Sequence, residues 1–175
     1  MANKNIQLTE YIRNVPDFPK KGILFRDITP LLADRDAFAA AVEALAGPFD
    51  GADIDYVAAV EARGFIFGSA VAKKINSGFI PIRKQGKLPY KTCSVTYSLE
   101  YGTDTLEVHS DAAKAGVRVL MVDDLLATGG TMAAACRLIK NLGAKIVGLS
   151  FLVELTDLGG REKLTDYSIH TVISY

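Results

Sequence analysis

The chain has 175 residues, of which 49% are hydrophobic and 23% are charged. This length and balance are typical of a globular protein, and we expect residues 1–175 to form a single domain around a substantial core. Twenty basic and twenty acidic residues give a formal net charge of zero. This balance argues against a nucleic-acid partner, because nucleic-acid-binding proteins usually carry a basic surplus.

The sequence also indicates a cytoplasmic protein. No apolar run reaches the length of a membrane helix, and the N-terminal stretch MANKNIQLTEYI has no signal-peptide core. Cys93 and Cys136 lack the spacing of a metal site or a disulfide framework, so we expect reduced thiols. We therefore expect no membrane partner.

The N-terminal region contains a short predicted helix and a segment outside the main pattern. Residues 8–15 place apolar side chains at helical spacing, and the prolines and glycine of residues 16–22 predict an irregular connection. In the next segment Phe25 offers a stacking surface for a planar base, whose edge the backbone at Leu24 and Arg26 could contact. The alternative is a Phe25 packed in the core with Arg26 in solvent, and composition alone favours that alternative.

The first central strand is predicted at residues 55–60. It runs into Glu61-Ala62-Arg63-Gly64, which a helical pattern follows. A charged pair and a glycine between a strand and a helix are typical of a loop that binds an anion, with Arg63 and Gly64 as candidates. The alternative is an ordinary turn in which Glu61 and Arg63 pair with each other.

A basic cluster follows the second predicted strand, residues 79–83, in which Pro81 suggests a sheet edge or a strand start. Arg83, Lys84 and Lys87 gather here on a chain that has no net charge. The cluster is either a solvated loop or a local anion site, and we favour the anion site.

The stretch VRVLMVDDLLATGGT, residues 117–131, combines three features in order. An apolar run with the length of a buried strand ends at Asp123 and Asp124. Small and hydroxyl-bearing residues follow and open a helical pattern: Ala127, Thr128, Gly129, Gly130 and Thr131. Backbone N–H groups at a helix start bind phosphate, and glycine lets the backbone approach closely.

Each half of this stretch has an ordinary alternative, which is a tight turn without ligand or an acid pair in solvent. The ordered combination is stronger evidence, because each part has a separate task on one ligand. The loop lacks the Gly-Lys-Ser/Thr of a Walker loop and the GxGxxG of a dinucleotide site. Two carboxylates before a phosphate loop are placed to accept hydrogen bonds from the vicinal hydroxyls of a ribose. The stretch therefore predicts a ribose phosphate site.

The C-terminal third continues the alternation of helices and strands. A helix is predicted at residues 132–142, and strands are predicted at 145–153 and 169–174. Glu154 and Asp157 follow the first of these strands, where they either face the site or lie in solvent. The alternation favours an α/β fold with a mainly parallel sheet flanked by helices, and ligand loops then gather at the carboxyl ends of the strands.

The stretch VLMVDDLLATGGT resembles the 5-phosphoribosyl-1-diphosphate (PRPP) motif of the type I phosphoribosyltransferases, whose fold is Rossmann-like. The resemblance implies that residues 127–131 hold the 5-phosphate and that Asp123 and Asp124 hold the ribose hydroxyls. The loop at Arg63 and Gly64 is similar to the pyrophosphate loop of the family. There many relatives carry Asp-Ser-Arg-Gly, and this chain departs from them with Glu-Ala. A few basic residues on a mobile loop suit pyrophosphate, which makes Arg83, Lys84 and Lys87 further candidates.

Two further segments narrow the resemblance to the adenine phosphoribosyltransferases. PDFPKKGILFRDITPLL is similar to their small N-terminal hood, here residues 1–35. This similarity implies that Phe25 stacks on adenine, with Leu24 and Arg26 contacting the base edge through backbone groups.

YSLEYG is similar to the flexible catalytic loop of the same enzymes, here a β-hairpin loop within residues 84–109. From the residues alone, 92–97 and 105–109 are expected to pair as its strands. The resemblance implies that Glu100 is the acid beside the base and that Tyr101 closes the loop as a lid.

The implied activity is purine salvage, in which PRPP and adenine give AMP and pyrophosphate. The implied catalytic groups are Glu100, Asp123, Asp124 and Arg63. The implied cofactor is Mg²⁺, held through PRPP without a direct protein ligand set, with Asp123 and Asp124 as the candidate contacts. The family also implies a homodimer. The alternatives are a phosphoribosyltransferase for xanthine or hypoxanthine and a non-catalytic PRPP-sensing regulator.

Overall fold

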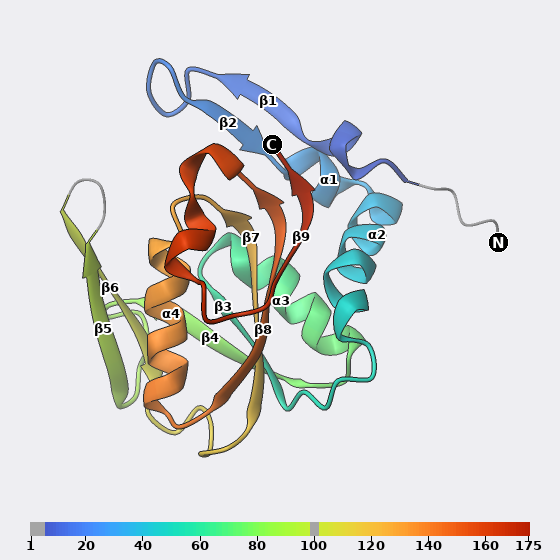
Figure 1. The fold of residues 1–175 in the computed structure, drawn as a ribbon. Coiled ribbons are helices and arrows are strands. Elements are labelled where there is room, and N and C mark those ends of the chain that lie inside the picture. The colour runs from blue at the N-terminus through green and yellow to red at the C-terminus, as the bar shows by residue number, and fades with distance from the viewer. Residues whose placement is uncertain (1–5, 99–101) are drawn as a thin grey trace.

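The computed structural model describes residues 6–98 and 102–175 (Figure 1). The strands of this part of the chain are β1 (Arg13–Pro16), β2 (Leu24–Asp27), β3 (Tyr56–Val60), β4 (Gly78–Lys84), β5 (Thr92–Ser98), β6 (Thr103–His109), β7 (Arg118–Leu126), β8 (Lys145–Glu154) and β9 (Ile169–Ser174). The α-helices are α1 (Thr29–Ala33), α2 (Arg35–Ala46), α3 (Arg63–Lys74) and α4 (Gly130–Asn141). Short 3₁₀ turns are η1 (Leu8–Tyr11), η2 (Gly47–Phe49), η3 (Thr156–Leu158) and η4 (Gly160–Lys163).

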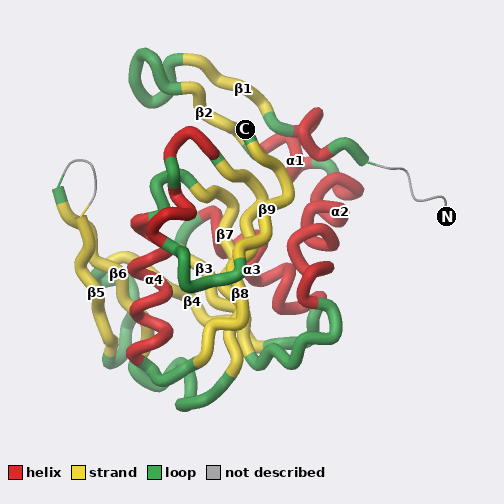
Figure 2. The backbone as a smooth tube through the Cα atoms, in the orientation of Figure 1, coloured by secondary structure: helices red, strands yellow, loops and turns green. Residues whose placement is uncertain are grey.

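The main sheet is mostly parallel, as the alternation of elements predicts. Its order is β5-β6-β4-β3-β7-β8-β9. The pairs β3–β4, β3–β7, β7–β8 and β8–β9 are parallel, whereas β4–β6 and β5–β6 are antiparallel. The tube view in Figure 2 shows this sheet as the centre of the molecule, with β5 and β6 at one edge. The predicted α/β fold and the predicted hairpin are confirmed.

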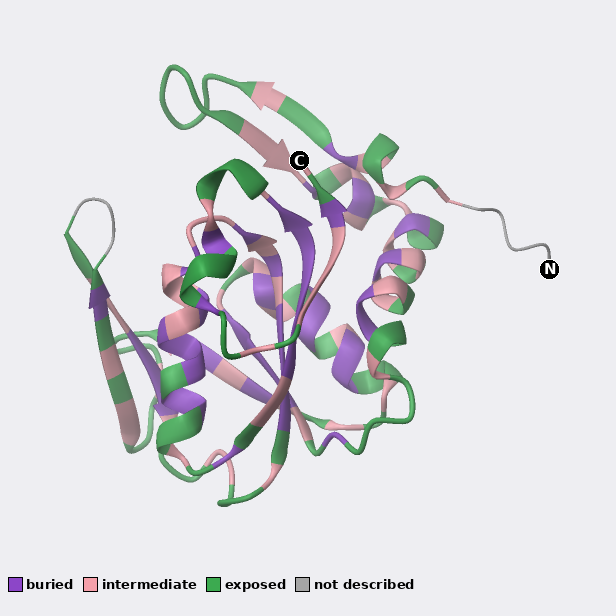
Figure 3. Cartoon of the chain, viewed as in Figure 1, coloured by how far each residue is buried: buried purple, intermediate pink, exposed green. Residues whose placement is uncertain are grey.

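Both faces of the sheet are buried, which explains the continuous apolar run in β7. Val119 and Met121 belong to the cluster that contains the buried residues of α4. Leu120 and Val122 belong to the cluster formed with α2 and α3. All four are fully buried, and Figure 3 shows the central strands as buried between the helices. Alternate side chains of a strand point to opposite faces, so a strand covered on both sides needs apolar residues throughout.

The strand β7 is longer than the sequence predicts. It continues through Asp123 and Asp124 to Leu126, because β8 pairs with it as far as Leu126 opposite Glu154. The prediction that the strand ends at the acid pair is therefore wrong. Asp123 and Asp124 therefore belong to a strand that is paired with β8, and they do not lie in the loop that follows it.

The prediction of an N-terminal helix at residues 8–15 is also wrong. A single 3₁₀ turn is followed by β1, which pairs antiparallel with β2. An eight-residue helix that ends at a proline is only marginally stable, whereas the β1–β2 pairing satisfies the same backbone groups.

Pro81 lies in β4, which has neighbours on both sides and is not an edge strand. Its register partner on β3 is Ala59, whereas β6 pairs with β4 only at Arg83 and Lys84. On its other side, β4 therefore has no paired strand beside Pro81. The missing N–H of proline on that side costs no ladder bond.

The β1–β2 ribbon lies over the end of the main sheet, next to the C-terminal residue (Figure 1). The end of the ribbon at Arg13 and Asp27 is anchored, since the flanking residues Ile12 and Ile28 are buried in the cluster that includes α2. The guanidinium of Arg26 lies 3.7 Å from the centre of the Tyr175 ring. No helix of the described ranges 6–98 and 102–175 is long and apolar enough to cross a bilayer.

We expect the substitution Asp34→Ala to lower the free energy of unfolding by about 1 kcal/mol, because it removes a helix cap. Asp34 Oδ1 accepts from the N–H groups of Asp36 at 3.0 Å and Ala37 at 2.8 Å, at the start of α2. Urea unfolding measures the loss, and Asp34→Asn is the matched control because it keeps a capping oxygen. Equal stability of the Ala variant and the wild type would contradict the capping role.

Candidate active site

A cleft of about 290 Å³ opens where β3 and β7 end. These strands are parallel neighbours, so the loops that follow them emerge side by side. Val60 to Gly64 line one wall and Asp123 to Met132 line the other. The structure thus brings together Arg63, Gly64, the acid pair and residues 127–131.

The loop after β7 ends at the N-terminus of α4. Gly129 precedes the helix with φ +76°, a conformation that favours glycine, and no side chain caps the helix start. The first N–H groups of a helix have no intrahelical partner, so those at the start of α4 face the cleft as donors. Together with the helix dipole they form a site suited to a phosphate.

A second glycine supports this loop from behind. A Cβ on Gly129 would lie 2.3 Å from the Gly160 carbonyl oxygen, and a Cβ on Gly160 would lie 2.2 Å from the Ala127 carbonyl oxygen. The two backbones are therefore in direct contact. The sequence contains Gly159-Gly160, but nothing in its pattern relates this pair to a loop thirty residues earlier.

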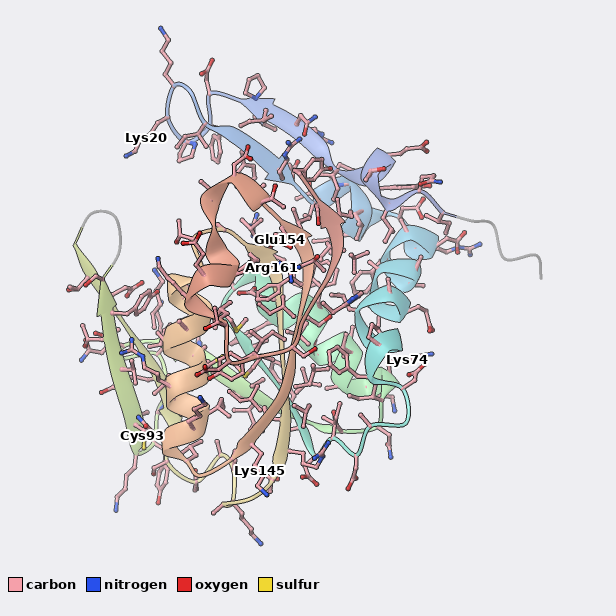
Figure 4. All side chains as sticks on the ribbon, viewed as in Figure 1. Lys20, Lys74, Cys93, Lys145, Glu154 and Arg161 are labelled. Atoms are coloured by element: carbon pink, nitrogen blue, oxygen red, sulfur yellow. The ribbon has the colours of Figure 1, made fainter. Side chains whose placement is uncertain are left out.

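Glu154 anchors the turn that carries Gly160. Its carboxylate receives two bonds of 2.7 Å from Arg161, one from Nε and one from Nη2 (Figure 4). These bonds lower the pKa of Glu154, although its carboxyl is buried. Neither alternative describes Glu154, which is the ion-pair partner of Arg161 behind the loop of residues 127–131. Asp157 is exposed.

The acid pair packs tightly against the start of α3. A Cβ on Gly64 would lie 2.7 Å from Asp123 Oδ1, so this carboxylate occupies the space that glycine leaves. Asp123 Oδ1 also accepts from the N–H of Asp124 at 2.9 Å. Arg63 Nη2 lies 2.9 Å from Asp124 Oδ2, a charge contact without hydrogen-bond geometry. Asp124 Oδ2 is thus a buried oxygen without a hydrogen-bond donor among the described residues.

Burial dominates the electrostatics of both acids. It raises the pKa of Asp123 well above the ordinary value, and the neighbouring Asp124 charge raises it further. Burial also raises the pKa of Asp124, against the lowering effect of Arg63. The pair is therefore a destabilised anionic site that gains from hydroxyl donors or positive charge.

Glu61 does not pair with Arg63, contrary to the ordinary-turn alternative. Its Oε2 accepts from Arg83 Nη2 at 2.8 Å, and its Oε1 accepts from the Lys84 N–H at 2.7 Å. Burial would raise the pKa of Glu61, but these bonds outweigh it and lower the pKa. Arg63 is thereby left for Asp124.

The basic cluster lies beside the cleft and does not line it. Arg83 is paired with Glu61, and Lys84 Nζ lies 3.1 Å from Asp104 Oδ2. The carbonyl of Lys87 accepts from Arg83 Nη1 at 3.0 Å. The basic cluster is thus held next to the loop at Arg63 by two ion pairs and a hydrogen bond.

The hood lies against the same loop without lining the cleft. The Arg63 guanidinium is 5.3 Å from the centre of the Phe25 ring. Leu24 is exposed, and Arg26 donates to Asn14 as well as stacking on the C-terminal tyrosine. Glu100 and Tyr101 lie outside the described residues.

The comparisons with known proteins agree with this geometry. Residues 31–174 match the phosphoribosyl transferase domain, which defines the class as a phosphoribosyltransferase. The adenine phosphoribosyltransferase of Pseudothermotoga lettingae is 56% identical over 97% of this chain and 100% of its own length. That of Brachyspira hyodysenteriae is 54% identical over the same shares.

Solved structures extend the match to three dimensions. The adenine phosphoribosyltransferase of Thermoanaerobacter pseudethanolicus has a TM-score of 0.93 and 52% identity, covering 96% of this chain and 98% of that chain. That of Rhodothermus marinus has a TM-score of 0.92 and 49% identity, covering 96% of both chains. The chain belongs to the adenine phosphoribosyltransferases, the glycosyl-transferring enzymes of purine salvage, which confirms the resemblance.

We expect Gly64→Ala to abolish most turnover while the fold survives. The new Cβ would lie 2.7 Å from Asp123 Oδ1, so the terminal carboxylate of Asp123 has to rotate away. We expect Asp123 to position the substrate, and such a displacement costs on the order of a hundredfold in rate. Steady-state assays and thermal unfolding measure the two effects. Gly47→Ala is the control, because a Cβ there meets nothing within 4 Å; wild-type turnover in Gly64→Ala would contradict this role.

We expect Asp123→Asn to be as stable as the wild type at pH 7.5, or more stable by on the order of 1 kcal/mol. A carboxyl whose pKa is raised by folding contributes stability at acidic pH that is lost as the pH rises through the raised pKa. The advantage of the neutral amide should therefore shrink as the pH falls toward about 4, the ordinary range of an aspartate.

Urea unfolding at several pH values tests this expectation. Asp157→Asn is the control, because it makes the same change on an exposed side chain. An Asp123→Asn variant that is least stable, relative to the wild type, at high pH would show the sign to be wrong.

Proposed function

We propose that PRPP binds in the cleft, with its 5-phosphate on residues 127–131 and its ribose hydroxyls on Asp123 and Asp124. Adenine then displaces pyrophosphate at the anomeric carbon and AMP forms. The observation that carries this proposal is the cleft itself, because one wall supplies the uncapped start of α4 and the other supplies Arg63. The 39% identical Saccharomyces cerevisiae enzyme was solved with adenine and an imino-altritol bisphosphate, which supports a base site beside a phosphate site.

Displacement at an anomeric carbon develops positive charge on the ribose. We propose that Asp123 and Asp124 stabilise this charge as well as orient the hydroxyls, because their burial leaves them poorly compensated. Burial destabilises the charged form of both carboxylates, so a ligand that brings hydroxyl donors or positive charge stabilises them.

The leaving pyrophosphate is proposed to meet Arg63 and Gly64 at the start of α3, where backbone N–H groups lack intrahelical partners. Arg83, Lys84 and Lys87 are proposed to contribute their positive field from beside the cleft. Because Glu61 and Asp104 already hold Arg83 and Lys84, the side chain of Lys87 is the member that we expect to approach pyrophosphate.

Adenine is proposed to stack on Phe25, with Leu24 and Arg26 contacting its edge through backbone groups. The position of the Phe25 ring beside Arg63 supports this proposal, since it brings the hood next to a loop that lines the cleft. Glu100 would move a proton near adenine N7 and Tyr101 would close the loop; both roles rest on the family resemblance.

The residues present fit a Mg²⁺ ion that is held mainly by the substrate. The acid pair supplies oxygen ligands, one of them without a hydrogen-bond donor, whereas the described residues contain no group of three metal-binding side chains. When bound with PRPP, Mg²⁺ would neutralise pyrophosphate charge. Asp123 and Asp124 would contact the ion directly or through water.

The remaining proposals concern organisation. Residues 1–175 would act as one domain, with residues 1–35 as the hood and 84–109 as the flexible loop. We propose a cytoplasmic enzyme, which the free thiols of Cys93 and Cys136 support. We also propose a homodimer, as the family implies, which sedimentation would show as about twice 18.8 kDa.

An assay with PRPP, Mg²⁺ and one base at a time tests the proposed function. We expect AMP and pyrophosphate from adenine, and little product from hypoxanthine, xanthine or guanine. Phe25→Ala should raise the KM for adenine about tenfold, the effect of losing one stacked base contact, and leave the KM for PRPP unchanged. Phe25→Tyr keeps the ring and is the control. PRPP binding without product would favour a regulator, and an unaltered adenine KM in Phe25→Ala would refute the stacking.

A further inference from the structure

Tyr97 contacts the phosphate loop from the hairpin. It lies near the end of β5 and is only 8% exposed. Its hydroxyl oxygen lies 3.2 Å from Thr131 Oγ1. Its ring lies next to Gly130, where a Cβ would be in ordinary van der Waals contact, 3.9 Å from Tyr97 Cδ2. A buried phenol is thus packed on two residues of the loop at the start of α4.

The direction of the Tyr97–Thr131 hydrogen bond follows from the chemistry of the proposed ligand. A hydroxyl carries one proton to donate and two lone pairs to accept, whereas an ionised phosphate oxygen only accepts. If Thr131 donates to the phosphate, its oxygen can only accept from Tyr97. The phenol must then donate, which is its stronger tendency, since a phenol is more acidic than an alkyl hydroxyl.

We propose that Tyr97 is a positioning residue for PRPP: its hydroxyl donates to Thr131 Oγ1 and so directs the Thr131 proton to the 5-phosphate. The inference rests on the proposed binding of that phosphate to residues 127–131. Without Tyr97, the Thr131 proton is free to turn toward other acceptors. The bond to the phosphate then has to be selected from several rotamers at a cost in affinity.

Tyr97 does not contact the proposed PRPP site directly. Thr131 lines the cleft, whereas Tyr97 does not. The structure therefore assigns Tyr97 an effect that acts through Thr131. If Tyr97 acts through Thr131, removing the Tyr97 hydroxyl must have no further effect on PRPP binding once the Thr131 hydroxyl has been removed.

The test compares Tyr97→Phe, Thr131→Val and the double variant. Tyr97→Phe keeps the packed ring and removes only the hydroxyl. We expect it to raise the KM for PRPP roughly fivefold, within the range of one lost neutral hydrogen bond, with a much smaller change in kcat and none in the KM for adenine. Thr131→Val should raise the KM for PRPP more, and the double variant should match Thr131→Val alone. Calorimetric binding of ribose 5-phosphate should follow the same order.

Tyr167→Phe is the matched control, since Tyr167 is a second tyrosine beside α4 and is half-buried. Its ring lies 4.8 Å from Lys140 Nζ near the far end of the helix. We expect the control to leave the KM for PRPP unchanged, whatever it does to thermal stability. A general loosening of α4 would change both variants alike and would overturn the proposal.

The outcomes separate the two levels of the inference. If Thr131→Val leaves PRPP binding unchanged, the proposed phosphate site is wrong. If Thr131→Val weakens binding but Tyr97→Phe does not, only the role of Tyr97 is wrong. If the two effects multiply in the double variant, Tyr97 acts independently of Thr131 and the positioning role is refuted.

Discussion

The structure of the site depends on holding two adjacent carboxylates near the end of β7, where Asp124 is buried and Asp123 is half-buried. Removing carboxylates from water is costly, and the raised pKa values of Asp123 and Asp124 express that cost. Their neighbours limit it: Arg63 supplies an opposite charge, and Gly64 leaves the space that the Asp123 carboxylate occupies. The parallel register of β3 and β7 places these neighbours, so the sheet itself assembles the charged centre.

The loop of residues 127–131 depends on a second set of contacts, in which Glu154, Gly160 and Arg161 support it from outside the lining of the cleft. Gly129 and Gly160 allow backbone contact behind the loop, and the Glu154–Arg161 pair fixes the turn that carries Gly160. On the other side, Glu61 braces the basic cluster through Arg83. Glu61 and Glu154 thus each hold an arginine in place, which leaves Arg63 to the acid pair.

Much of this arrangement could be predicted from the sequence, because periodicity and local motifs specify it. The parallel core, the hairpin and the strand at 169–174 were predictable, as was the meeting of the Arg63 loop with residues 123–131. The partners of Glu61 and Glu154 were not, since each pairing depends on tertiary geometry. The contact between Gly129 and Gly160 was hidden for the same reason, and the extension of β7 depended on the length of β8. The acidic and lid residues at 100 and 101 lie outside the described residues and remain predictions.

The most direct test of the central claim is a crystal structure of the chain with ribose 5-phosphate bound. We expect the phosphate to accept hydrogen bonds from backbone N–H groups at the start of α4 and from the Thr131 hydroxyl. We also expect the ribose hydroxyls to lie within hydrogen-bond distance of Asp123 and Asp124. A phosphate bound at the basic cluster, or a sugar directed away from the acid pair, would contradict the site that we propose.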